Sequence, residues 1–109
     1  MKAQEKEEKA QIRFRYAVGL YKALQDSSLR SFRKLAKEAG MEPAHIQKIS
    51  VGKLDVTLTT SIALAKALGI SYTALSAYYD GVTEKDTQAF IQNMEKQKKT
   101  RGKEKNKDL

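Results

Sequence analysis

Side chains able to act in catalysis or metal binding are few in this chain of 109 residues, and they are scattered. His45 is the single histidine, cysteine is absent, and no acidic residue stands at metal-ligand spacing from His45. A metal site is therefore not expected, and no cofactor is implied. The sequence contains neither a serine, histidine and acid arrangement nor a glycine-rich phosphate loop, so it does not favour an enzyme.

The remaining candidate chemistry is hydrogen bonding by side chains between residues 43 and 51. Gln47 carries an amide that donates and accepts, and Lys48 carries an ammonium that donates. If this segment is helical, spacings of three and four residues place the following side chains on one face: Ala44, Gln47, Lys48 and Val51. Ile46 and Ile49 then point inward, while Pro43 and His45 flank the outward face.

Two short helices joined by a tight turn would position these side chains. The first helix is indicated by apolar residues spaced by three and four: Leu29, Phe32, Leu35, Ala36 and Ala39. Its N-cap is either Ser28 or Ser31, and Ser28 is favoured because Leu29 continues the apolar stripe. Gly40 can adopt the left-handed conformation that ends a helix, with Met41 packing back on the last turn. Pro43 suits the first position of the next helix, so the pair is predicted to be a helix-turn-helix.

Helices are also predicted on both sides of this pair. Residues 12–25 should bury one face, made of Ile12, Tyr16, Leu20, Ala23 and Leu24, and a close helix crossing would explain Gly19. Thr57 should cap a helix whose apolar face is Leu58, Ile62, Ala65 and Leu68, with Leu64 beside it and Gly69 at its end. Ser71 should cap the last core helix, with Tyr72, Leu75 and Tyr79 inward and Asp80-Gly81 at its end. No segment alternates as a strand does, so the domain is predicted to be all-α.

The two ends of the chain differ from the domain at residues 12–81. Residues 1–11 are charged and are expected to be disordered or a frayed extension of the first helix. Residues 82–98 are expected to form a C-terminal helix that Thr83 caps, with Asp86 as its capping-box partner. This helix either docks on the domain or pairs with a second chain. Residues 99–109 are expected to be a disordered basic tail, which is a solvated end, a DNA arm or a partner-binding segment.

The charge balance favours a polyanionic partner. Lysine and arginine number 21 against 13 acidic residues, which gives a net charge of +8. Nucleic acid is the first candidate for such a chain. No apolar run approaches the roughly 18 residues of a membrane span, so we expect a soluble, cytoplasmic protein with no membrane partner.

The pattern of the helix pair resembles the Cro/repressor-type (XRE-like, lambda-repressor-like) helix-turn-helix family. The resemblance rests on Leu35-Ala36, Gly40, Ile46, Ile49 and Gly52, and continues through Thr57-Leu58, residues 64–71 and Leu75. It covers roughly residues 12–80. The resemblance implies a five-helix DNA-binding domain, here with an additional C-terminal helix and a basic tail. It also implies a bacterial or phage transcriptional regulator whose second motif helix, residues 43–50, lies in the major groove of double-stranded DNA.

In that frame the base-reading candidates are Pro43, Ala44, Gln47 and Lys48. Gln47 can pair with adenine N6 and N7, Lys48 can donate to guanine O6 and N7, and Ala44 can touch a thymine methyl. Family members often carry a polar reader where this chain has Pro43. We therefore expect modest sequence specificity, or reliance on DNA shape.

The family also suggests phosphate contacts, with one departure. Family members often have a phosphate-gripping glutamine where this chain has Phe32, and Arg30, Arg33 or Ser31 could substitute for it. Lys53 and Thr57 match family backbone-contact positions, and His45 and Val51 complete the phosphate-contacting set, although a plain surface role competes for His45 and Lys53.

Three alternatives stay open from the sequence. The fold could serve as a protein-interaction module, such as an antitoxin or an adaptor, or it could bind RNA, or its role could be structural only. Family members commonly bind two-fold related half-sites as dimers, which makes a homodimer through Phe90, Ile91 and Met94 plausible.

Overall fold

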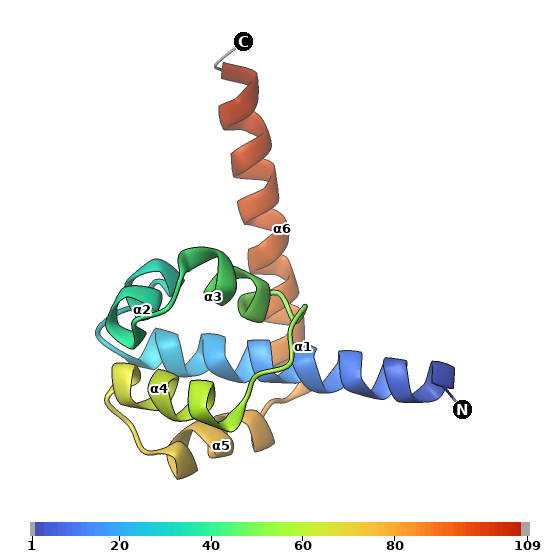
Figure 1. The fold of residues 1–109 in the computed structure, drawn as a ribbon. Helices are drawn as coiled ribbons and strands as arrows, with labels where there is room; N and C mark the ends of the chain where they lie inside the picture. Colours follow the sequence, from blue (N-terminus) through green and yellow to red (C-terminus); the bar gives the residue numbers. More distant parts are fainter. Residues whose placement is uncertain (1, 108–109) are drawn as a thin grey trace.

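The computed structural model describes the backbone of residues 2–107 and the side chains of residues 5–96. Over these residues the chain is all-helical and contains no strand, as predicted. The helices are α1 (Lys2–Asp26), α2 (Phe32–Ala39), α3 (Pro43–Ser50), α4 (Leu58–Leu68), α5 (Tyr72–Asp80) and α6 (Glu84–Lys107). Figure 1 shows α1 running across the middle of the molecule, with α2 and α3 on one side and α4 and α5 on the other.

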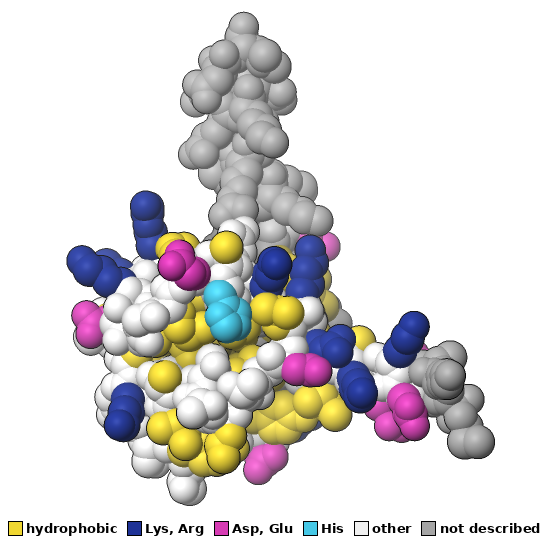
Figure 2. Space-filling view, in the orientation of Figure 1, with side chains coloured by type: hydrophobic (Ala, Val, Ile, Leu, Met, Phe, Trp, Pro, Cys, Tyr) yellow, Lys and Arg dark blue, Asp and Glu magenta, His cyan; other side chains and the backbone are white. Residues whose placement is uncertain are grey.

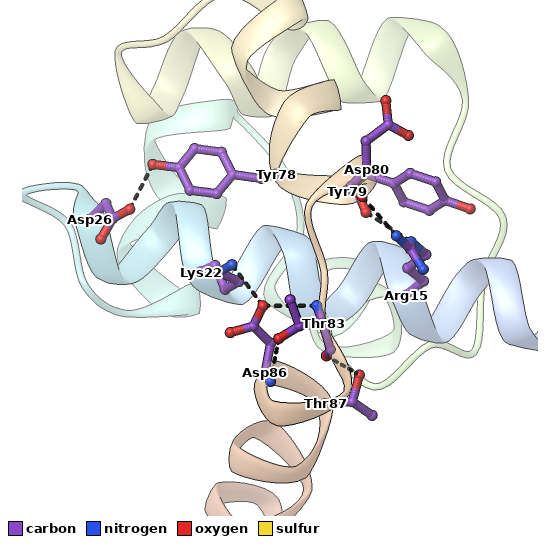
Figure 3. Close-up of polar contacts among 9 residues, drawn as sticks. All are labelled: Arg15, Lys22, Asp26, Tyr78, Tyr79, Asp80, Thr83, Asp86 and Thr87. Atoms are coloured by element: carbon purple, nitrogen blue, oxygen red, sulfur yellow. Dashed lines mark hydrogen bonds and ion pairs between the residues drawn. The ribbon is translucent and has the colours of Figure 1, made fainter.

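Polar side chains of α1 tie it to α5 and α6 (Figure 3). The Arg15 guanidinium donates to the carbonyl oxygens of Tyr79 and Asp80 at 2.9 and 2.8 Å, where α5 ends. The Tyr78 hydroxyl donates to the Asp26 carboxylate at 2.7 Å. Lys22 pairs with Asp86 of α6 at 2.8 Å. These bonds are made by residues more than fifty positions apart in sequence, so α1 is the frame on which the later helices are placed.

The main core lies between α1 and the helices from α2 to α5. Its largest fully buried side chains are Leu20, Leu24, Leu35, Ile46, Ile49 and Leu64. Gly19 lets α5 approach α1, because a Cβ at this position would lie 3.0 Å from Tyr79 Cα. The close crossing predicted from Gly19 is therefore confirmed.

The predicted start of the second helix is corrected. Ser31, not Ser28, is the N-cap of α2, and its Oγ accepts from the Lys34 N–H at 3.2 Å. Arg30 has a left-handed backbone with φ of 59°, so a helix cannot run through it from Leu29. Leu29 still packs against the core, but from the loop.

The predicted inward face of α4 is also corrected. Leu58 and Ile62 are exposed, at 59% and 39%, and the buried face is instead Ser61, Leu64, Ala65 and Leu68. Ser61 can be buried because its hydroxyl pairs with the Tyr16 hydroxyl at 3.0 Å. The helix is thereby rotated away from the face that the apolar pattern alone indicates.

Two further residues predicted to point inward are exposed. Tyr72 at the start of α5 is 46% exposed, and Ile12 is 55% exposed. Helix α1 begins at Lys2, and its N-terminal part projects beyond the other helices (Figure 1). Residues 2–11 thus extend the first helix, in agreement with one of the two predicted alternatives.

Helix α6 docks on α1. Phe90 is 3% exposed and meets the rings of Phe14 and Tyr21 edge-on at 5.5 and 5.6 Å. Its start is the predicted capping box: Thr83 N–H donates to Asp86 Oδ2 at 2.9 Å, and Asp86 N–H donates to Thr83 Oγ1 at 3.1 Å. Because Phe90 is buried within its own chain, it cannot be the centre of the predicted homodimer contact with Ile91 and Met94.

The end of α6 differs from the expectation for the tail. The helix continues to Lys107, past the predicted end at residue 98, so it covers most of the segment at residues 99–109 that was expected to be disordered. Lysine predominates there, with one glutamate and one arginine, and these residues have good helix propensity.

Candidate nucleic-acid interface

The turn between α2 and α3 is fixed by glycine and by two backbone bonds. Gly40 has φ of 68°, the left-handed conformation that favours glycine. Gly40 N–H donates to the Lys37 carbonyl at 3.3 Å, and Met41 N–H donates to the Ala36 carbonyl at 2.8 Å. This pair of bonds is a Schellman motif, and Met41 packs against the core as predicted.

Helix α3 presents one buried face and one open face. Ile46 and Ile49 are 2% and 1% exposed, which confirms their predicted inward direction. The other face is exposed and consists of Pro43, Ala44, His45, Gln47 and Lys48. Neither the Gln47 nor the Lys48 side chain is engaged with the described part of the chain, so their hydrogen-bonding groups point to solvent.

The end of α3 is held against α1. Gly52 has φ of 75°, and a Cβ there would lie 3.0 Å from Phe14 Cα. The Arg13 guanidinium pairs with Asp55 at 2.6 Å, and this bond holds the pKa of the Asp55 carboxyl below its usual range. The connection from α3 to α4 is therefore fastened to α1 at two points, which sets the position of α3. Sequence analysis missed the Arg13–Asp55 pair, since the two residues are 42 positions apart and carry no local signal.

The predicted phosphate-contacting residues lie at helix ends around α3. Lys53 is exposed directly after Gly52, and Arg33 is exposed in the first turn of α2. Ser31 Oγ accepts the capping bond, which leaves its hydroxyl proton available to a phosphate oxygen. Thr57 differs, because its Oγ1 accepts from Thr60 N–H and its proton goes to Thr60 Oγ1. A phosphate at this helix start would therefore meet backbone N–H groups rather than the Thr57 hydroxyl.

The two remaining predicted contacts, His45 and Val51, and the departure at Phe32 are placed as follows. His45 is exposed beside the outward face of α3, and Val51 is half-buried at the end of that helix. Phe32, which stands where family members often carry glutamine, packs against the core as expected.

Unpaired positive charge is concentrated around the α2–α3 pair. Of the bases between residues 12 and 82, Arg13, Arg15 and Lys22 are held by bonds to other parts of the chain. The remaining ones are exposed and form no side-chain bond within the described residues, and all but Lys66 lie between residues 30 and 53: Arg30, Arg33, Lys34, Lys37, Lys48 and Lys53. Figure 2 shows lysine and arginine side chains on both sides of the single histidine of this face. The arrangement suits a large anion that spans both helices.

Other ligand classes have less support in the described part of the chain. His, Cys, Asp and Glu side chains nowhere gather there in groups of three able to hold a metal ion. A shallow groove between α1 and the start of α6 is lined by Phe14, Tyr79 and Val82, and its charged lining residues are three acids and one base: Glu7, Glu8, Glu84 and Arg15. Among the residues that the structure describes, no helix by itself combines the length and apolarity of a membrane span, although α4 and α5, bent by 100° at their junction, would qualify as a pair by length and composition alone.

Comparison of the chain with protein-family models, with curated proteins and with solved structures finds no match.

Proposed function

We propose that the chain is a transcriptional regulator of the Cro/repressor type that binds double-stranded DNA. In this proposal α1 to α5 are the five helices of a lambda-repressor-like domain, α2 and α3 are its helix-turn-helix, and α3 enters the major groove. The observation that carries the proposal is the open face of α3, with Gln47 and Lys48 free, at the centre of the exposed bases between residues 30 and 53. Phosphate contacts from those bases would position the helix, and α3 would read base edges.

The DNA sequence that α3 recognises is expected to be short. Gln47 supplies the bidentate pair for adenine, Lys48 donates to guanine, and Ala44 and Pro43 offer apolar contact for thymine methyl groups. A proline in the first turn cannot donate to a base, so DNA shape would supply part of the specificity. Selection from a random duplex library should return a short consensus, and a long, strict one would contradict this part of the proposal.

The proposal is tested by titrating duplex DNA against the wild type and the Gln47→Ala/Lys48→Ala variant at two salt concentrations. A selected site should lose at least about tenfold in affinity, since each good side-chain-to-base pair contributes about 1–3 kcal/mol of discrimination. The matched control is Gln25→Ala/Lys66→Ala, which removes the same side-chain types from exposed positions on α1 and α4. This control should bind as the wild type does.

Two results would overturn the proposal. One is the absence of binding to any duplex at low salt, and the other is an equal loss of affinity in the control variant.

A protein-interaction module, such as an antitoxin or an adaptor, is the second candidate. The observation in its favour is that the Phe32 side chain packs against the core. Family members often carry a glutamine that contacts the DNA backbone at this position. This candidate predicts no duplex binding at low salt, so the same titration separates the two.

A further inference from the structure

The N-terminal part of α1 carries acids and bases on different sides of the helix. Lys6, Lys9 and Arg13 follow one another at spacings of three and four, so they form one stripe. Glu7 and Glu8 instead line the groove between α1 and the start of α6. This end of the helix is close to neutral in total, yet one of its sides is basic. We name Lys6, Lys9 and Arg13 the α1 stripe.

The α1 stripe faces the connection from α3 to α4. Arg13 pairs with Asp55 of that connection at 2.6 Å. The Arg13 bond lowers the pKa of Asp55 most, and Lys9, one turn earlier on α1, is close enough to lower it further. Exposed Lys53 stands on the same side, because Gly52 before it packs against the backbone of α1. The basic surface around α2 and α3 therefore continues onto α1.

Two members of the α1 stripe are available to an external anion. Lys6 and Lys9 are exposed and form no hydrogen bond or ion pair with the described residues. Glu5 precedes Lys9 by four positions on the helix surface, but no ion pair joins these two described side chains. Arg13 differs, since Asp55 offsets its charge. The stripe thus offers two free ammonium groups.

The α1 stripe extends past the rest of the molecule. Figure 1 shows the N-terminal part of α1 projecting beyond the other helices. Figure 2 shows lysine and arginine side chains from the face that bears the histidine outward along this projection. Lys6 and Arg13 are seven positions apart, which is about 10 Å along the helix axis. One strand of duplex DNA has a phosphate about every 3.4 Å of its axis, so the stripe spans about three phosphates.

We propose that Lys6 and Lys9 bind the phosphate backbone of DNA that flanks the site read by α3, on the side toward which α1 projects. This inference rests on the proposed function and adds a contact outside the helix-turn-helix. A lysine binds phosphate as a point charge, and phosphate contacts carry no direct sequence information. The stripe therefore raises the affinity for a duplex long enough to reach it and leaves the preferred sequence unchanged.

The test compares the wild type with Lys6→Gln/Lys9→Gln on two duplexes. One is trimmed to the selected site, and the other is extended on each side by half a helical turn, about five base pairs. On the long duplex the variant should lose nearly two units of the slope of log affinity against log salt concentration, at about 0.9 for each phosphate. A fourfold rise in salt should then weaken the wild type about tenfold more than the variant. On the trimmed duplex the two should bind alike, because trimming removes the same contact.

Two further variants separate the position of the charge from its amount. Lys6→Glu/Glu7→Lys keeps the net charge but moves the base toward the groove side, and it should weaken binding to the long duplex. Lys66→Gln/Lys85→Gln removes the same charge as Lys6→Gln/Lys9→Gln from exposed positions on α4 and α6, and it should match the wild type on both duplexes. All substituted positions are exposed and the new residues are good helix formers, so each variant should keep its fold, which circular dichroism verifies.

The outcomes distinguish this inference from the proposed function. The inference alone is overturned if Lys6→Gln/Lys9→Gln keeps the wild-type slope on the long duplex, if it weakens both duplexes equally, or if the charge-swapped variant binds as the wild type does. A wild type that binds neither duplex at low salt would overturn the proposed function and this inference together.

Discussion

At the scale of single residues, Asp86 has two structural roles, one within α6 and one between α6 and α1. One of its carboxylate oxygens accepts from both Lys22 of α1 and the Thr83 N–H, so the same group caps α6 and ties it to α1 (Figure 3). The Lys22 bond, followed by the Thr83 backbone bond, lowers the pKa of Asp86 to about 2 from 3.8. The ionised Asp86 carboxylate therefore stabilises the folded state more than the protonated carboxyl group does.

This pKa predicts how the stability of the chain depends on pH. A group whose pKa is lower in the folded state stabilises the fold above its unfolded pKa, and this stabilisation is lost as pH falls through the folded value. Asp86→Asn should thus be less stable than the wild type at neutral pH, and the difference should shrink between about pH 4 and pH 2. Urea unfolding of both proteins across that range measures the difference.

Glu84→Gln is the control for Asp86→Asn, because Glu84 is an exposed acid in the same first turn of α6. Its difference from the wild type should be much smaller. A stability gap for Asp86→Asn that stays constant down to pH 2 would contradict the assigned role of the carboxylate.

At the scale of helices, the crossing of α1 and α5 depends on the absence of one methyl group. A Cβ at Gly19 would lie 3.0 to 3.2 Å from backbone atoms of Tyr78 and Tyr79, and backbone yields less readily than a flexible side chain. Gly19→Ala should therefore destabilise the fold: overpacking costs about 1–3 kcal/mol, against a gain of about 1 kcal/mol in helix propensity.

Urea unfolding tests the Gly19→Ala prediction by a lower midpoint. Gln11→Ala changes an exposed position of the same helix without a neighbour to displace, and its midpoint should stay close to that of the wild type. If Gly19→Ala instead raises the midpoint, propensity outweighs the crossing and the packing argument is wrong.

The helix boundaries show which structural signals a sequence contains. The caps at Thr57, Ser71 and Thr83 were predictable because each bond joins residues three positions apart. The start of α2 was not predictable, because it depends on the left-handed backbone of Arg30. Glycine is the residue that usually indicates this conformation, and position 30 is an arginine.

The orientation of α4 shows the limit of apolar periodicity. Serine counts as a polar, outward residue in a sequence pattern, yet Ser61 is buried because Tyr16, 45 positions earlier, supplies its partner. The exposure of Leu58 and Ile62 follows from that distant pair. For the candidate interface, the spacing of Ile46 and Ile49 was enough to predict which face of α3 is open. The Arg13–Asp55 ion pair could not be predicted, because it depends on tertiary packing.

At the scale of the whole molecule, folding separates the bases that are bonded within the chain from those that stay exposed to solvent. Bonds within the chain occupy Arg13, Arg15 and Lys22 of α1, whereas the exposed bases of residues 30–53 form no side-chain bond within the described residues. A basic total thus becomes a basic surface around α2 and α3.

If the basic surface binds phosphates, the salt dependence of DNA binding should respond to where a charge is removed. Each phosphate neutralised contributes about 0.9 to the slope of log affinity against log salt concentration. Arg33→Gln/Lys53→Gln should reduce that slope by roughly two units and weaken all duplex sequences alike. Lys66→Gln/Lys85→Gln removes the same charge from exposed positions on α4 and α6. Since these lysines lie outside the α2–α3 region, this control should leave the slope nearly unchanged. Equal slopes for the two variants would mean that net charge alone drives binding, and that α2 and α3 do not define the phosphate-binding surface.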